Sequence, residues 1–265
     1  MSPAPLMLTL RQAVLRIVTL GRGVPRVVNG IPLRVDIAGR HTFTPVYDAG
    51  ATAYLREHIR DGDEVWNVGA NVGVYALQLA HWVGPAGRVV AFEPNPAARA
   101  VLSKNVRFNG LDRRIEVVAS AVGAAPGTVE FFISGTDGMG RAGLPNPLLR
   151  HPRRITVPVT TLDDVVRERR TAPALVVMDI EGWEIAALQG ARALLATTPF
   201  VMELHPNAWQ WSGHTRADLD AIIAAERLTV VPLSGQAEPL GDYGQVVLEP
   251  RGAGPSVLAR APGEW

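Results

Sequence analysis

The chain of 265 residues contains no cysteine and a single lysine, Lys104. The absence of cysteine excludes disulfide frameworks, thiolate zinc sites, iron–sulfur clusters and thiol nucleophiles. It also favours a reducing compartment, so we expect a cytoplasmic protein. The 26 basic and 25 acidic residues leave a net charge of +1. No strong overall field therefore attracts nucleic acid or anionic lipid, and nucleic-acid binding is not expected.

Long apolar runs are missing as well. Arg11 and Arg16 interrupt the apolar stretch near the N-terminus, which falls short of the roughly 20 residues that a membrane-spanning helix requires. An Arg-bearing start without acidic residues before Asp36 is typical of some transit peptides and surface anchors. We expect instead a short helix over residues 8–20 that packs its Leu and Val side chains on the body of the protein, and no membrane span.

Strand and helix patterns divide the chain into an N-terminal extension and one α/β domain. Asn29-Gly30 between two β-rich runs predicts a hairpin over residues 26–36, and a helix is expected over 49–60. From residue 61 onward, strands alternate with helical patterns, which indicates a parallel sheet with helices on both faces. We therefore expect an extension over residues 1–60 and a second unit over residues 61–265.

The element boundaries follow from apolar runs and turn residues. The expected strands cover residues 65–69, 88–93, 115–120, 127–133, 155–159, 174–180, 199–204, 228–233 and 245–250. Helices are expected up to Trp82, over 96–108, after Thr161, over 183–196, and after Thr215. Thr215 and Asp218 are expected to form a capping box at the start of the last helix. Residues 134–153 consist of loop-forming residues, and a loop of that length in a compact domain is usually functional or disordered.

A glycine turn follows the first strand of the alternating region. Gly69 and Gly73 lie where a buried strand turns into a helix, so the backbone there can approach a ligand and offer it free N–H groups. A dinucleotide-binding GxGxxG pattern requires glycine where the chain has Asn71 and Val74. The next strand ends in Glu93, at the position where an acid accepts ribose hydroxyls in nucleoside-binding α/β folds. Together these features favour a nucleoside cofactor.

Acidic residues and a histidine gather at the ends of two later strands. One strand ends at Asp179 and Glu181, and another ends at Glu203 and His205. The carboxyl ends of neighbouring parallel strands form the ligand-binding edge of such sheets. Three interpretations stay open. In the first, a carboxylate or His205 acts as the general base. In the second, Asp179, Glu203 and His205 hold a divalent metal ion. In the third, the carboxylates accept backbone N–H groups and His205 only packs.

Two tryptophans, Trp209 and Trp211, lie in the loop just past this edge. Their rings either form a wall for a bound molecule or cap the core beneath the loop.

Several motifs in order resemble one enzyme family. NVGANVGVYALQLA, VVAFEPNP, KNVRFNGL, TTLDD, MDIEGWE with LQGA, and MELHP, spread over residues 61–206, look like the FkbM family of S-adenosylmethionine-dependent methyltransferases. The resemblance implies a class I methyltransferase (Rossmann-like) fold. This fold is a seven-stranded sheet with helices on both faces, here preceded by the helix and hairpin of the extension.

The resemblance also implies where the methyl donor lies. Its methionine part is expected against residues 67–73, its ribose on Glu93 and its adenine near the end of the third strand. The implied donor-binding residues are Asn67, Gly69, Ala70, Asn71, Gly73, Glu93, Pro94, Ser120, Ala121 and Asp179. Two positions depart from the family, which usually has Asp at Asn67 and often Lys at Val177. Asn67 donates and accepts hydrogen bonds but supplies no negative charge.

The resulting expectation is an O-methyltransferase that acts on a hydroxyl of a sugar or secondary metabolite. Asp179, His205 and Glu203 are the candidate catalytic residues, residues 1–60 are expected on the acceptor side, and metal-free chemistry is favoured over a divalent ion. Two alternatives are a nicotinamide-dependent oxidoreductase on the same kind of sheet and a nucleoside-binding module without chemistry. The sequence indicates neither the acceptor nor the oligomeric state.

Overall fold

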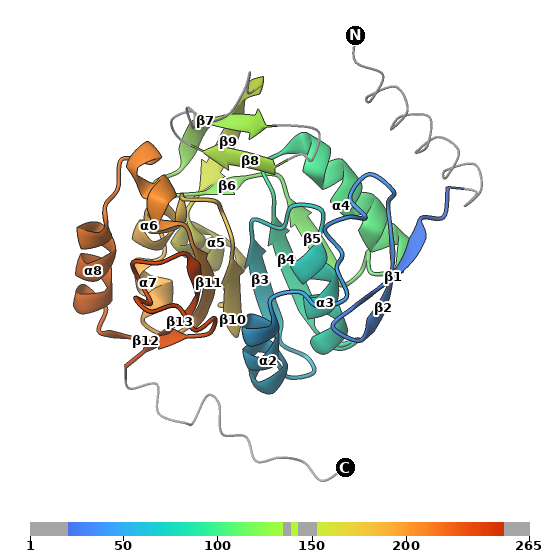
Figure 1. Cartoon of the computed structure of the whole chain (residues 1–265), viewed down its shortest axis with the longest axis horizontal. Helices are drawn as coiled ribbons and strands as arrows, with labels where there is room; N and C mark the ends of the chain where they lie inside the picture. The colour runs from blue at the N-terminus through green and yellow to red at the C-terminus, as the bar shows by residue number, and fades with distance from the viewer. Residues whose placement is uncertain (1–20, 135–138, 143–152, 252–265) are drawn as a thin grey trace.

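The computed structural model describes residues 21–134, 139–142 and 153–251 (Figure 1). The helix expected over residues 8–20 lies outside these residues. Within the described part of the chain, no helix is both long and apolar enough to cross a membrane.

A seven-stranded sheet forms the centre of the molecule, in the order β12-β13-β11-β10-β3-β4-β5. Its parallel strands are β3 (Glu64–Val68), β4 (Arg88–Phe92), β5 (Ile115–Val118), β10 (Leu175–Met178) and β11 (Phe200–Leu204). The edge strand β12 (Leu228–Pro232) and β13 (Gly244–Pro250) pair antiparallel, and β13 is also antiparallel to β11. The central strands are buried on both faces, which explains their continuous apolar runs.

Helices cover both faces of this sheet, as Figure 1 shows. One face carries α2 (Ala49–His58), α3 (Val74–Trp82) and α4 (Pro96–Phe108). The other carries α5 (Leu162–Arg169), α6 (Glu184–Gln189), α7 (Arg192–Leu195) and α8 (Arg216–Ala225). Each set packs its leucines against the sheet in a separate apolar core. The expected class I fold, a seven-stranded sheet with helices on both faces, is confirmed.

Local sequence signals set several helix ends. Asn95 caps α4 through a hydrogen bond from the Ala97 N–H (3.0 Å), Thr161 caps α5, and Thr215 forms the predicted capping box with Asp218.

The single helix expected over residues 183–196 is wrong, because α6 and α7 are separate. Gly190, between them, packs so closely that a Cβ would lie 2.0 Å from the Gly123 carbonyl oxygen. The Asp163 carboxylate accepts the N–H groups of Ala193 and Leu194 (both 3.0 Å), so a second helix starts there with its own cap.

The predicted hairpin is present as β1 (Val24–Val28) and β2 (Ile31–Val35). Its turn residues Asn29 and Gly30 both have positive φ, 48° and 84°, as a type I′ turn requires. The Asn29 side-chain nitrogen lies within 2.9 Å of the Tyr47 carbonyl, the Thr52 hydroxyl and the Gln78 amide oxygen. This contact holds the segment before α2 against α3.

A second, four-stranded sheet has the order β6-β9-β7-β8. It contains β6 (Ala121–Val122), β7 (Gly127–Ser134), β8 (Met139–Ala142) and β9 (Arg153–Thr160). The expectation of a continuous loop over residues 134–153 is wrong at β8, since residues 139–142 pair antiparallel with β7. Residues 135–138 and 143–152 of that segment lie outside the described residues. The sheet brings Phe131 and Ala142 to the edge of the cavity described next.

Candidate functional site

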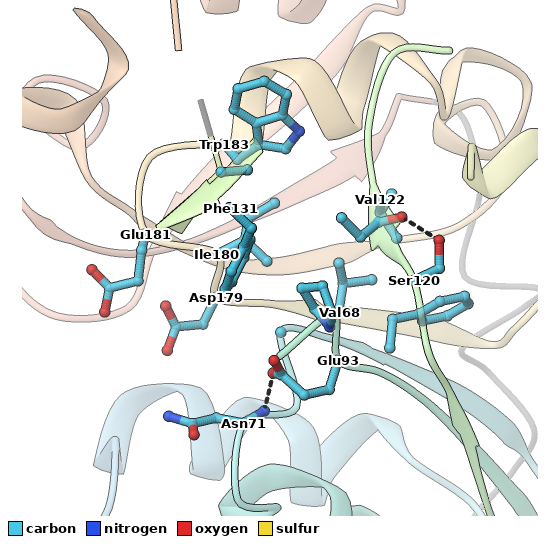
Figure 2. A pocket seen from close by; sticks show the side chains of 15 residues that line it. Val68, Asn71, Glu93, Ser120, Val122, Phe131, Asp179, Ile180, Glu181 and Trp183 are labelled. Atoms are coloured by element: carbon cyan, nitrogen blue, oxygen red, sulfur yellow. Dashed lines mark hydrogen bonds between the residues drawn. The ribbon is translucent and has the colours of Figure 1, made fainter. Parts of the chain in front are cut away.

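A cavity opens where β3, β4 and β10 reach their carboxyl ends (Figure 2). Seven of the residues expected to bind the donor line it, namely Gly69, Asn71, Glu93, Pro94, Ser120, Ala121 and Asp179. Three others, Asn67, Ala70 and Gly73, lie outside its lining. The sequence reasoning did not foresee the wall that Phe131, Ala142 and Trp183 add.

The glycine turn brings two strand ends into contact. Gly69 has φ +84°, and a Cβ at this position would lie 1.8 Å from the carbonyl oxygen of Asp179. Gly73 begins α3 with φ +99°, where a Cβ would lie 2.6 Å from Leu102 Cδ1. Gly69 therefore requires glycine for packing against backbone as well as for its conformation, and Gly73 favours glycine through its positive φ. The turn lets Asp179 and the residues after β3 share one small volume.

Glu93 points its carboxylate into this cavity, as Figure 2 shows. Oε2 accepts the Asn71 N–H and Oε1 accepts the Asn95 N–H, each at 2.7 Å. Burial raises the pKa of Glu93 to about 7, although the two backbone N–H groups act in the opposite direction. Each oxygen retains a second lone pair, so the carboxylate can still accept hydroxyl groups of a ligand.

Buried polar atoms without a partner surround the glycine turn. In the described part of the chain they include both side-chain polar atoms of Asn67, Asn71 Oδ1 and Asp179 Oδ1. The Asn67 side chain is fully buried. Buried polar groups in native proteins nearly always have a partner, and a ligand is one way to supply it. Amide and carboxylate groups of this kind suit the amino and carboxylate ends of an amino acid, so the residues fit the expected donor.

Trp183 Nε1 is a further unpartnered donor, at the opposite wall of the cavity. The Trp183 ring packs against the apolar cluster that contains Ala121, near the place where the resemblance implies the adenine of the donor.

His205 follows β11 and lies among three carboxylates. Its Nδ1 is 2.8 Å from Glu184 Oε1, while its Nε2 is 3.7 Å from Glu181 Oε2 and 3.9 Å from Asp179 Oδ1. Burial acts to lower the pKa of His205, but the hydrogen bond to Glu184 and the neighbouring carboxylates raise it above the ordinary value of 6.5. The side chain is therefore able to take up a proton near neutral pH.

The Asp179 and Glu203 carboxyls lie near each other at the ends of neighbouring strands, and both have raised pKa values. Burial and the charge of Glu203 raise the pKa of Asp179 well above its usual value. Burial, with the charges of Asp48 and Glu181, raises the pKa of Glu203 to about 7. Glu203 also accepts a hydrogen bond from the Tyr243 hydroxyl. The edge thus holds carboxyls that retain protons unusually well.

A set of three residues at this edge has the spacing of a metal site. Ligand atoms of Asp179, Glu181 and His205 all lie within 4.8 Å of one another. The sequence predicts Glu203 as the third ligand, whereas the described cluster contains Glu181. Either set offers only oxygen and imidazole ligands.

Glu184 is a site residue that the sequence reasoning missed. It is fully buried and accepts hydrogen bonds from the Gly182 N–H and from Trp209 Nε1, both at 2.8 Å, besides its contact with His205. A glutamate inside the apolar run EIAALQ was the available signal. Trp209 itself is 2% exposed and caps the core, so of the two roles considered for its ring the packing role applies.

A second hollow lies beside Glu203, between the start of α2 and the segment joining β12 to β13. Its polar lining includes Asp48, Glu203, Gln236, Tyr243 and Gln245. None of the described residues that line this hollow or the first cavity is Lys or Arg.

Tyr47 and Tyr75 lie next to these carboxyls. The Tyr75 hydroxyl donates to Asp48 Oδ2 (2.8 Å), and the two rings pack edge to face with centroids 5.3 Å apart. Burial and the charge of Asp179 raise the pKa of Tyr47, which shows how near the N-terminal segment comes to the edge.

Comparison with known proteins gives one family and several distant structures. The sequence profile of the Methyltransferase FkbM domain matches residues 67–227, more than half of the chain. Over 85 residues the chain is 35% identical to the 31-O-demethyl-FK506 methyltransferase FkbM of Streptomyces tacrolimicus. That match covers 31% of this chain and 32% of the relative, so the chain matches about a third of the relative's length.

The similar solved structures share little sequence with this chain. They include an rRNA methylase from Streptococcus thermophilus (12% identity, TM-score 0.46), with 75% of this chain and 92% of that chain covered. An O-methyltransferase from Bacillus cereus in complex with SAH has 12% identity and a TM-score of 0.45, with 76% and 78% covered.

Proposed function

This chain belongs to the FkbM methyltransferase family, and on that premise we propose that it transfers the methyl group of S-adenosylmethionine to a hydroxyl oxygen of a sugar or secondary metabolite. The observation that carries the proposal is the shared cavity of Gly69, Glu93 and Asp179, with His205 beside it. The methylated oxygen in the name of the Streptomyces tacrolimicus relative supports a hydroxyl acceptor.

The chain's residues divide the work between donor and acceptor. Glu93 accepts the ribose hydroxyls, and the unpartnered Oδ1 atoms of Asn71 and Asp179, two residues that line the cavity, take the methionine end. S-adenosylmethionine, when bound, supplies a methyl group on a sulfonium sulfur: the C–S bond breaks as the new O–C bond forms, and the electron pair of the C–S bond stays on sulfur. His205 Nε2 receives the proton that the acceptor hydroxyl loses. Alignment of the reactants contributes on the order of 7–11 kcal/mol to such reactions.

The second hollow supports an acceptor without anionic groups. Asp48, Glu203, Gln236 and Tyr243 offer hydrogen bonds to hydroxyls, and the described lining contains no cation to balance a phosphate or carboxylate. Because Asp48 belongs to the N-terminal segment, this hollow also supports the proposal that residues 1–60 form an extension on the acceptor side of a methyltransferase domain over residues 61–265.

Two alternatives compete with this proposal. A nicotinamide-dependent oxidoreductase needs room for a pyrophosphate at the glycine turn, and the side chains of Asn71 and Val74 reduce that room. Membership of the FkbM family also counts against an oxidoreductase. A nucleoside-binding module without chemistry has no need for the Asp179 and His205 pair. The binding of the cofactor is the first property to test.

We expect S-adenosylmethionine and S-adenosylhomocysteine to bind, and NADH not to bind, when each is titrated calorimetrically into the full chain. The physical reason is the GANVG turn, which leaves space for an amino acid carboxylate rather than a pyrophosphate. Tight NADH binding without a response to the sulfonium donor would contradict the proposal.

Donor binding is expected to depend on pH through Glu93, whose pKa is about 7. Ribose hydroxyls donate to the ionised carboxylate, so binding favours loss of the proton and strengthens as pH rises through 7. If only the ionised form binds, the Kd near pH 6 is about tenfold larger than near pH 8. Glu93→Gln removes the titrating group and serves as the control. An equal pH dependence in this variant would assign the effect to another group, including the amino group of the donor.

A further inference from the structure

Glu184 is a fully buried carboxylate, whereas fully buried positions in proteins usually hold apolar side chains. It begins α6, is 0% exposed, and is followed by four buried apolar residues. A buried carboxyl costs free energy unless hydrogen bonds replace its lost water. The three hydrogen-bonding contacts of the Glu184 carboxylate therefore indicate which groups this residue positions.

Two of the three contacts of Glu184 come from groups that can only donate. The Gly182 N–H reaches Oε1 and the Trp209 indole N–H reaches Oε2, both at 2.8 Å, and neither of these groups can accept. An ionised carboxylate only accepts, so the third partner, His205 Nδ1 at 2.8 Å from Oε1, must carry a proton. A neutral His205 then has its lone pair on Nε2.

The second nitrogen faces the reacting edge. His205 Nε2 is 3.7 Å from Glu181 Oε2 and 3.9 Å from Asp179 Oδ1, and Asp179 also lines the donor cavity. Rotation of the ring by half a turn would give Glu184 a carbon in place of Nδ1. The contact therefore selects both the ring orientation and the tautomer.

We infer that Glu184 is a positioning residue that holds His205 as the Nδ1–H tautomer, with the Nε2 lone pair directed at Asp179 and Glu181. The inference rests on the proposed methyl transfer for its catalytic meaning. It applies equally whether Nε2 accepts the hydroxyl proton or binds a divalent ion, because metal-bound histidines also hold their other N–H in a hydrogen bond.

Nitrogen-15 NMR of the full chain tests this assignment without any acceptor. Two-bond correlations between ring protons and nitrogens distinguish the tautomers, and His205→Ala identifies the signal among the six histidines. On the alkaline side of the imidazole titration, we expect wild-type His205 to be the Nδ1–H form. Glu184→Gln should shift it to a mixture or to the Nε2–H form, since the amide of Gln also donates.

Trp209→Phe is the matched control, because it removes a different donor from the same carboxylate and should leave the Nδ1–H signal in place. An Nε2–H tautomer in the wild type, or an unchanged His205 signal in Glu184→Gln, would overturn the inference. The wild-type spectrum decides the matter even if Glu184→Gln does not fold. Binding of S-adenosylhomocysteine, measured by calorimetric titration, does not depend on the His205 tautomer. A failure of the methyltransferase proposal would therefore be seen in the calorimetry and a failure of the tautomer inference in the NMR spectrum.

Discussion

Glu93→Ala is expected to weaken donor binding by about 2–4 kcal/mol, or roughly 30- to 900-fold in Kd. The variant removes the acceptor of two ribose hydroxyls. Because Glu93 is only 5% exposed, water cannot easily take the place of its carboxylate. It also leaves the Asn71 and Asn95 N–H groups without their partner. Calorimetric titration of S-adenosylhomocysteine measures the change.

Two controls separate recognition of the ribose from general damage. Glu57→Ala removes an exposed carboxylate from α2 and should leave the Kd unchanged. Glu93→Gln keeps the size of the side chain and should give a smaller loss than Glu93→Ala. Circular dichroism and thermal unfolding check that each variant is folded. If folded Glu93→Ala protein binds the donor as tightly as the wild type, the ribose lies elsewhere.

The features that could be predicted from the sequence are those set by neighbouring residues. Asn29-Gly30 fixes the hairpin because both residues adopt positive φ with little strain. Thr161 and Thr215 cap helices through hydrogen bonds that span three residues. Glu93 could be placed because an acid at the end of a parallel strand always lies at the ligand edge.

The features that were missed depend on contacts distant in sequence. The break between α6 and α7 follows from Asp163, which lies 30 residues before Ala193. Strand β8 exists because residues 139–142 pair with β7, although the sequence MGRA shows no alternation. A hydrogen bond across 21 residues gives Glu184 its place beside His205. No local pattern encodes the first two, and for Glu184 the run EIAALQ shows only an isolated carboxylate, not its partner.

The carboxyl edge combines two requirements that oppose each other. Asp179, Glu181 and Glu203 give it negative charge, which suits a cationic sulfonium donor. Burial and neighbouring carboxylates raise the pKa of Asp179 well above its usual value and that of Glu203 to about 7, so Glu203 carries only part of its negative charge near neutral pH. His205, with Nε2 between Asp179 and Glu181, is the group best placed to exchange a proton with an acceptor.

His205→Ala is expected to lower the turnover number by about 10²–10⁴ and to leave donor binding nearly unchanged. A neutral imidazole is required, so the wild-type rate should rise with pH through the pKa of His205, which lies above 6.5. The variant should lose that rise. Transfer of a radiolabelled methyl group to a hydroxyl acceptor measures the rate, and His81→Ala, at an exposed position of α3, is the matched control.

A divalent ion at the same edge predicts a different set of results. If Asp179, His205 and either Glu181 or Glu203 hold the ion, a chelator stops turnover, and added magnesium or manganese restores it. Glu181→Ala then raises the metal concentration needed for half-maximal rate, because its carboxylate is in the described cluster. If His205 acts alone as the base, the chelator changes nothing. Full activity of His205→Ala in excess chelator would contradict both schemes and leave Asp179, whose pKa burial and the charge of Glu203 raise well above its usual value, as the remaining base.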